Sequence, residues 1–166
     1  MKLLVPEDKI HAIKLEANEY ISHTLTDRQL CDIELILNGG FSPLTGFLNQ
    51  ADYQSVLDDL RLLDGSVWPI PITLDVNDEL ADLLSIGDSL ALKDKEGFLI
   101  AILCIESKWQ PNKSEEAEKV FKSTDEIHPG VNFLFNESKS WYLGGILRGV
   151  VLPKHYDFID LRQTPD

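Results

Sequence analysis

The sequence contains few basic residues. Lysine and arginine together number 15, whereas aspartate and glutamate number 28, so the formal net charge at pH 7 is −13. A chain with this charge repels the phosphate backbone of nucleic acids and the anionic surface of membranes. We therefore expect no nucleic-acid partner and no membrane partner, although a local group of basic side chains can still bind an anion.

Cysteines and long apolar runs are also scarce. The two cysteines, Cys31 and Cys104, stand in apolar surroundings, which predicts buried free thiols and no disulfide framework. The longest apolar run, Phe98–Ile105, is too short to cross a bilayer. The residues before Pro6 lack the apolar region of a secretory signal. These absences predict a cytoplasmic location.

Several common site motifs are missing. The sequence has two glycine clusters, NGGFSPLTGFL at 38–48 and GGILRG at 144–149. Neither continues into the Gly-Lys-Ser/Thr of a phosphate-binding loop, and the second lacks the glycine order of a dinucleotide fingerprint. The histidines have no second His or Cys at zinc-ligand spacing. DVNDE resembles the start of a calcium loop, but Leu80 stands where glycine is required, so a helix cap at Asn77 or Asp78 explains it better. The residues alone predict no catalytic, cofactor or metal site.

What the sequence does contain is an alternation of short helical and strand patterns. The clearest helix is predicted over 27–37, because Thr26 and Gln29 form a capping box and Gly39 suits the residue after the helix end. Other helices are expected after Asn49, after Asn77 and over 114–121, the last capped by Ser114 or Asn112. Strands are expected over 20–25, 66–76, 89–93, 98–109 and 141–152.

Hairpin connections dominate this order of elements, which predicts an α+β fold with a mixed, mainly antiparallel sheet. Pro69 and Pro71 fall within one strand pattern, so that strand should lie at an edge or a bend. Bending of this kind, together with the glycines in the last strand, predicts a small β-barrel with several short helices.

Charged residues form two notable groupings. Arg148, Lys154 and His155 make the one local cationic neighbourhood, which either binds an anion or a partner or forms salt bridges within this acidic chain. The carboxylate pairs 58–59 and 115–116 lie on predicted solvent faces, where they would increase solubility.

Residues 32–76, DIELILNGGFSPLTGFLNQADYQSVLDDLRLLDGSVWPIPITLDV, closely resemble the N-terminal domain of the ATP sulfurylase (sulfate adenylyltransferase) family, a PUA-like domain. The resemblance continues through GDSLALKDKEG, AEKVFKSTDEIHPGV, WYLGGIL and HYDFIDLRQTP, so we assign 25–166 to this domain. Residues 1–24 match less well, since the family commonly has Pro-His-Gly-Gly where this chain has VPEDKIHA.

The resemblance implies a function within a larger enzyme. The family transfers the adenylyl group of ATP to sulfate, and its catalytic domain is recognised by Q-x-R-N, H-x-x-H and a later Gly-Arg-Asp, none of which occurs here. It therefore implies a structural and assembly domain that is inactive alone, with ATP and sulfate as substrates of the parent enzyme. Some members also carry an adenylylsulfate kinase domain.

The resemblance further implies that the partner is the sulfurylase catalytic domain, with a homo-oligomer formed through the parent enzyme. The candidate contact residues are Pro43, Leu44, Phe47 and the loop His128-Pro129-Gly130. The alternative is that these residues close the core of this domain. The alternative function is a free-standing PUA-like module that binds or regulates another protein.

Overall fold

The computed structural model describes residues 3–165 and divides the chain into two compact units. Unit 1 comprises Met1–Gly46, Gly87–Ile105 and Gly145–Asp166, and unit 2 comprises Phe47–Ile86 and Glu106–Gly144. The long strands β5 (Leu99–Trp109) and β6 (Trp141–Gly149) run through both units. Each unit is therefore assembled from segments that are far apart in the sequence.

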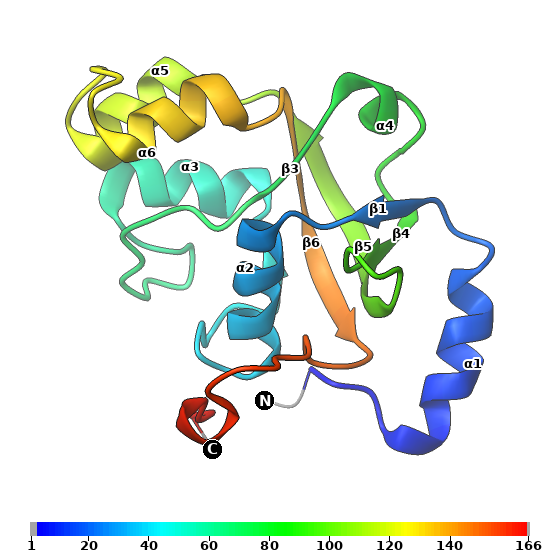
Figure 1. The fold of residues 1–166 in the computed structure, drawn as a ribbon. Coiled ribbons are helices and arrows are strands. Elements are labelled where there is room, and N and C mark those ends of the chain that lie inside the picture. The colour runs from blue at the N-terminus through cyan, green and yellow to red at the C-terminus, as the bar shows by residue number, and fades with distance from the viewer. Residues whose placement is uncertain (1–2, 166) are drawn as a thin grey trace. The chain divides into compact units, whose positions relative to one another are not determined.

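The strands form a six-stranded sheet within the described residues (Figure 1). The remaining strands are β1 (Ser22–Thr24), β2 (Gly46–Phe47), β3 (Leu74–Val76) and β4 (Ser89–Lys93). Their order is β1-β4-β5-β6-β2, with β3 also pairing with β6. The β4–β5 and β3–β6 pairs are antiparallel, whereas β1 and β4 are parallel. The predicted α+β fold with a mixed, mainly antiparallel sheet is confirmed. Among the described residues the strand order has two ends, β1 and β2, so the predicted barrel is not confirmed.

In unit 1, helix α2 (Asp27–Leu37) begins as the sequence predicts. The backbone N–H of Gln29 donates to Thr26 Oγ1 over 3.2 Å, and the backbone N–H of Thr26 donates to Gln29 Oε1 over 3.0 Å. Gly39 follows the helix with φ +85°, a conformation that glycine adopts without strain. The capping box and the helix end are confirmed.

One hydrophobic cluster of the unit 1 core lies between α1 (Glu7–Ala17) and the β4–β5 hairpin. Ile13 and Ala17 of α1 pack with buried residues of the hairpin, among them Ala91 and Ile102. The hairpin and its turn at 94–97 are confirmed. Helix α1 had no clear sequence signal, because its apolar residues are few and interrupted by charges.

In unit 2, three asparagines cap helices. Asn49 caps α3 (Gln50–Asp59), Asn77 caps α4 (Asp78–Asp82) and Asn112 caps α5 (Lys113–Glu116). Each side-chain oxygen accepts a backbone N–H three residues further on, which satisfies one donor of the first turn. These caps confirm the predicted helix starts, including the interpretation of DVNDE as a cap.

Two predictions for unit 2 are wrong. The predicted loop at 128–130 instead begins α6 (Pro129–Asn132), with proline at the first helical position, where the missing N–H is not needed. The strand predicted over 66–76 is limited to β3, because Pro69 and Pro71 cannot donate to a ladder. Segments of π-helix, Ala117–Phe121 and Phe133–Glu137, extend α5 and α6.

The cysteines differ from the prediction in burial. Both are free, as expected, but Cys31 is exposed and Cys104 is half-buried. The buried face of α2 contains Gln29 and Ile33, so Cys31, midway between them, lies on the outer face. Within residues 3–165, no helix combines the length and the apolar character that a membrane span requires.

Candidate functional site

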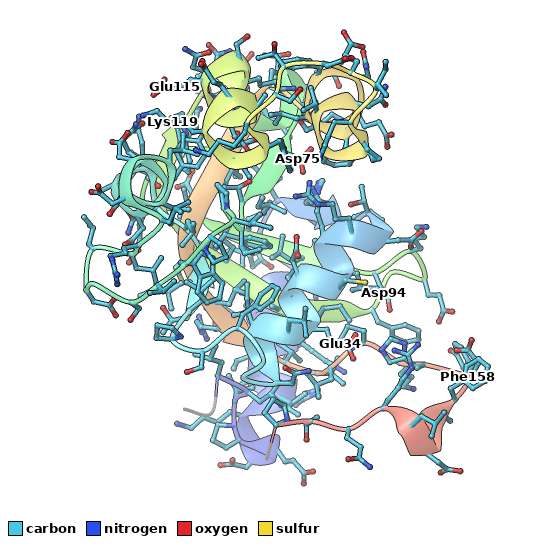
Figure 2. All side chains as sticks on the ribbon, turned by 90° about the vertical axis from the view of Figure 1, so that its left-hand side faces the viewer. Glu34, Asp75, Asp94, Glu115, Lys119 and Phe158 are labelled. Carbon is cyan, nitrogen blue, oxygen red and sulfur yellow. The ribbon has the colours of Figure 1, made fainter. Side chains whose placement is uncertain are left out.

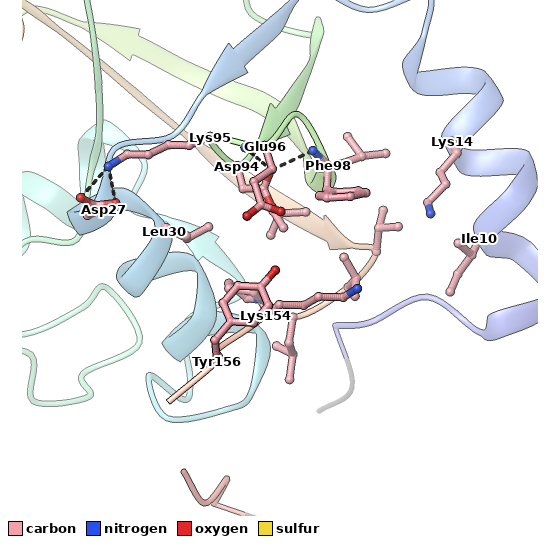
Figure 3. Close-up of a pocket in the computed structure, with 16 residues that line it drawn as sticks. Ile10, Lys14, Asp27, Leu30, Asp94, Lys95, Glu96, Phe98, Lys154 and Tyr156 are labelled. Carbon is pink, nitrogen blue, oxygen red and sulfur yellow. Dashed lines mark hydrogen bonds and ion pairs between the residues drawn. The ribbon is translucent and has the colours of Figure 1, made fainter. Parts of the chain in front are cut away.

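A hollow of about 370 Å³ opens on unit 1 beside the turn of the β4–β5 hairpin (Figure 3). Its floor is apolar and includes Leu30 of α2, Leu99 and Ile100 of β5, and Val150. This volume lies within the range of small-ligand pockets, which combine an apolar lining with a few placed polar groups. We call it the unit 1 groove.

Three acidic residues line the groove, Asp27, Asp94 and Glu96, and the carboxylates of the first two are engaged in local structure. Asp94 Oδ1 accepts the backbone N–H of Glu96 over 3.0 Å and that of Phe98 over 2.8 Å, which fixes the hairpin turn. Asp27 accepts a hydrogen bond from Lys95 over 2.6 Å, and both side chains are exposed (Figure 3). Neither carboxylate therefore points to a metal or catalytic function.

Lysines and aromatic rings complete the rim of the groove. The Lys154 ammonium lies 5.8 Å from the centre of the Phe98 ring, a distance typical of cation–π contact. Lys14 lines the groove from α1, and the exposed Tyr156 follows Lys154 on the last segment of the chain. Lys14 and Lys154 bring positive charge next to exposed aromatic surface, with the Glu96 carboxylate also lining the groove. The two lysines and the rings are suited to an anion with an apolar part.

Arg148 is engaged elsewhere in unit 1. Its guanidinium donates to both carboxylate oxygens of Glu16, over 2.8 and 3.1 Å, and Tyr20 donates to the same carboxylate over 2.6 Å. The Arg148 hydrogen bonds, followed by that of Tyr20, lower the pKa of Glu16 to about 2. His155 makes a comparable contact, with Nε2 2.8 Å from each carboxylate oxygen of Glu34. Of the predicted cationic neighbourhood, only Lys154 lines the groove.

The predicted contact residues of the α2–α3 connection differ in burial. Leu44 and Phe47 are buried, whereas Pro43, which follows a cis peptide bond, is exposed. Gly46 lies between Leu44 and Phe47 in the sequence, and a Cβ on Gly46 would stand 2.0 Å from the carbonyl oxygen of Gly145. The segment is therefore close-packed against β6 at Gly46, and of the three predicted contact residues Pro43 is the exposed one.

The predicted loop His128-Pro129-Gly130 begins helix α6 in unit 2. His128 Nδ1 accepts the backbone N–H of Gly130 over 3.1 Å, so the imidazole caps the helix. The His128 ring also lies 5.0 Å from that of Phe121. His128 and Pro129 are exposed, which leaves them accessible to a partner.

Sequence reasoning missed a buried carboxylate in unit 2. Glu116 was predicted on a solvent face, but it is buried, and its Oε2 accepts hydrogen bonds from Tyr53 over 2.9 Å and Tyr142 over 3.1 Å. Burial, followed by the charge of Glu116, raises the pKa of both tyrosines, so both remain protonated donors. The Trp109 ring packs against both tyrosines. This cluster is a structural element of unit 2.

The signal for this cluster lay in the tyrosines. Tyr53 falls on the apolar face of α3 and Tyr142 within the apolar β6, and a buried phenol needs a hydrogen-bond partner.

No group of three or more His, Cys, Asp or Glu side chains within residues 3–165 is placed to hold a metal ion.

Comparison with known proteins identifies the fold family. Residues 1–151 match the model of the PUA-like domain family. The chain belongs to that family. The PUA-like chain is also 49% identical to sulfate adenylyltransferase of Saccharomyces cerevisiae, a match that covers 96% of this chain and 33% of that protein. For the enzyme of Schizosaccharomyces pombe the identity is 50%, over 92% of this chain and 32% of that protein.

A solved structure is also similar to this chain over nearly its whole length. The chain matches a structure described as the hexameric APS kinase from Thiobacillus denitrificans, with a TM-score of 0.76 and 34% identity over 99% of this chain and 28% of that one. The resemblance to sulfate adenylyltransferase inferred from the sequence is confirmed. The PUA-like chain thus spans about a third of the length of the relatives that it matches.

Proposed function

We propose that this chain is the N-terminal structural and assembly domain of a sulfate adenylyltransferase, an enzyme that forms adenylyl sulfate and pyrophosphate from ATP and sulfate. The observation that carries the proposal is the match at 49% identity, which covers 96% of this chain but only 33% of the S. cerevisiae enzyme. The proposal includes a cytoplasmic location and a place in sulfate assimilation.

The chemistry of the reaction supports an inactive domain. Adenylyl transfer requires cations arranged around a triphosphate and an attacking oxyanion. In this chain, however, Arg148 is paired with Glu16 and His155 contacts Glu34. The formal charge of −13 adds further repulsion toward both substrates.

The partners follow from the same proposal. The catalytic part of the enzyme contacts this domain through exposed residues, among which Pro43, His128 and Pro129 remain our candidates. Lys154 is the candidate for an anion or partner contact at the unit 1 groove. The hexameric state of the T. denitrificans protein supports a homo-oligomer formed through the whole enzyme.

The test is a turnover assay of the purified 166-residue chain with ATP and sulfate. We expect no sulfate-dependent release of pyrophosphate, with the S. cerevisiae enzyme as the positive control. Sustained turnover by the chain alone would contradict the assignment to a non-catalytic domain.

A further inference from the structure

The segment after α3 in unit 2 folds into a small hairpin. The backbone N–H of Trp68 donates to Leu60 over 2.8 Å, that of Leu62 donates to Ser66 over 2.9 Å, and Arg61 forms an antiparallel bridge with Val67. The ribbon of this segment forms a loop that extends beyond the end of α3 (Figure 1). We call residues 60–70 the 60–70 hairpin.

Further hydrogen bonds hold the tip of the hairpin. The backbone N–H of Leu63 donates to the Asp52 carboxylate over 2.8 Å, which ties the tip to the first turn of α3. Arg61 Nη1 donates to the carbonyl of Gly65 over 2.9 Å, and the Gly65 N–H donates to Leu62 over 2.9 Å. Because the backbone is already ordered, binding a partner costs little conformational entropy.

This ordered hairpin presents apolar side chains to solvent. Leu62 is buried, and the alternation along a strand directs the Arg61–Val67 pair to the opposite face. The exposed apolar side chains are Leu60 (44%), Leu63 (65%), Val67 (66%) and Ile70 (50%). Single exposed apolar residues are ordinary, but four of them on one short hairpin are typical of a contact surface.

Leu60 lies where α3 ends and the hairpin begins. Its φ of +55° is the left-handed conformation of the helix C-cap, and its backbone N–H donates to Val56 over 3.0 Å. The helix end therefore fixes the backbone of Leu60, while its side chain remains 44% exposed.

The charges around the hairpin select the kind of partner. Asp59 and Asp64 are exposed beside the apolar side chains, and so is Arg61, whose guanidinium donates within the hairpin to the Gly65 carbonyl. In a symmetric contact, a second copy would bring the same acidic groups together, and each copy has a formal charge of −13. The charges therefore favour an apolar surface with a basic rim. The two thirds of the S. cerevisiae enzyme that this chain does not cover must bind ATP and sulfate, which requires cations. That part of the enzyme is therefore the expected location of basic side chains.

We propose that the 60–70 hairpin docks on an apolar, basic-rimmed surface in the remaining part of the sulfate adenylyltransferase chain. This proposal rests on the proposed function. The docked hairpin buries Leu60, Leu63, Val67 and Ile70, and its acidic neighbours face basic side chains of that surface.

The experiment measures thiol accessibility at Val67→Cys in two proteins. One is the 166-residue chain, and the other is a fusion in which this chain replaces the matching third of the S. cerevisiae enzyme. Maleimide labelling is followed by mass spectrometry of separate peptides, so that Cys31 and Cys104 do not interfere. We expect labelling at least about tenfold slower in the fusion, as burial at a packed interface implies. Glu118→Cys, at an exposed position of unit 2, is the control and should label equally in both proteins.

Ile70→Cys provides a second reporter in case Val67→Cys disturbs the hairpin. Equal labelling of both reporters in a catalytically active fusion would overturn the docking proposal and leave the proposed function standing. Protection in the 166-residue chain that increases with its concentration would identify a second copy as the occupant and also overturn the proposal. A folded but inactive fusion would overturn the proposed function, and the docking proposal with it.

Discussion

The phenol of Tyr53 donates a hydrogen bond of 2.9 Å to the carboxylate of Glu116, 63 residues further along the chain. Tyr142 donates to the same oxygen over 3.1 Å, so one buried acceptor joins α3, α5 and β6 within unit 2. Burial of a carboxylate raises the free energy of the folded state unless hydrogen bonds satisfy the carboxylate, and the two phenols donate those hydrogen bonds. The cluster should therefore be a major determinant of the stability of unit 2.

The first prediction concerns the acceptor of this cluster. Glu116→Ala should lower the free energy of unfolding by about 2–4 kcal/mol, because it removes the carboxylate acceptor of two buried hydroxyls and creates a cavity. The neighbouring Glu115→Ala is the matched control. Glu115 is half-exposed and pairs with Lys119 over 3.3 Å (Figure 2), so its loss should cost only about 0.5 kcal/mol. Urea unfolding of both variants provides the measurement, and equal losses would contradict the proposed importance of Glu116.

The second prediction concerns the ion pair of unit 1. Arg148→Met should lower the free energy of unfolding at pH 7 by about 1 kcal/mol, because the bidentate contact with Glu16 is partly exposed. The pKa of Glu16 is about 2 in the folded protein, against 4.5 ordinarily, so the contact stabilises the fold above pH 4.5. This stability is lost as the pH falls toward 2, and the difference between wild type and variant should disappear over the same interval.

Lys95→Met is the control for this pH dependence. Lys95 and Asp27 form an ion pair in unit 1, but both side chains are largely exposed, so the variant should differ from wild type by less than about 0.5 kcal/mol at any pH. Unfolding curves at several pH values decide the matter. A difference for Arg148→Met that stays constant down to pH 2 would show that the charge of Glu16 is not involved.

The third prediction concerns close backbone packing in unit 2. A Cβ on Gly144 would lie 2.1 Å from the carbonyl oxygen of Leu48, so Gly144→Ala must displace backbone and should cost at least about 3 kcal/mol. Gly65→Ala is the comparison. Gly65 has φ +89° but open space around it, so that variant should lose only about 1–2 kcal/mol from backbone strain. Thermal unfolding ranks the two variants, and the reverse order would contradict the packing described for Gly144.

The fourth prediction concerns the unit 1 groove. An aromatic anion such as anilinonaphthalene sulfonate should bind there, with its ring against Phe98 and its sulfonate near Lys154. Lys154→Glu should weaken binding about fivefold, equivalent to roughly 1 kcal/mol. Lys122→Glu, an exposed lysine of unit 2, should leave the affinity unchanged. Fluorescence titration measures both, and equal affinities would exclude Lys154 from the binding surface.

Local signals in the sequence predicted most elements correctly. The capping box at Thr26, the asparagine caps and the hairpin turn at 94–97 depend on neighbouring residues, so they can be read without knowledge of the fold. Helix α1 was left ambiguous, because Pro6 and the mixed charges interrupt the near-helical spacing of its apolar residues. Its sequence has little amphipathic pattern, and the contacts of Ile13 and Ala17 with distant strand residues define its buried face.

The candidate site could be predicted only in part. Lys154 was identified from sequence as a basic residue, but the groove that it lines combines α1, α2, β5 and the final segment, which no local pattern links. The burial of Glu116 likewise depends on two tyrosines remote in sequence. A salt bridge of Arg148 within the chain was one of two alternatives, and only the tertiary structure identifies Glu16 as its partner.

The most direct test of the proposed function is the activity of the fusion in which this chain replaces the matching third of the S. cerevisiae sulfate adenylyltransferase. Sulfate-dependent pyrophosphate release is measured for the fusion, for the parent enzyme and for the parent without that third. We predict that the fusion retains activity within about tenfold of the parent, a loss of no more than about 1.4 kcal/mol in transition-state stabilisation, whereas the truncated enzyme is inactive. A correctly folded fusion with no more activity than the truncated enzyme would contradict the proposed function.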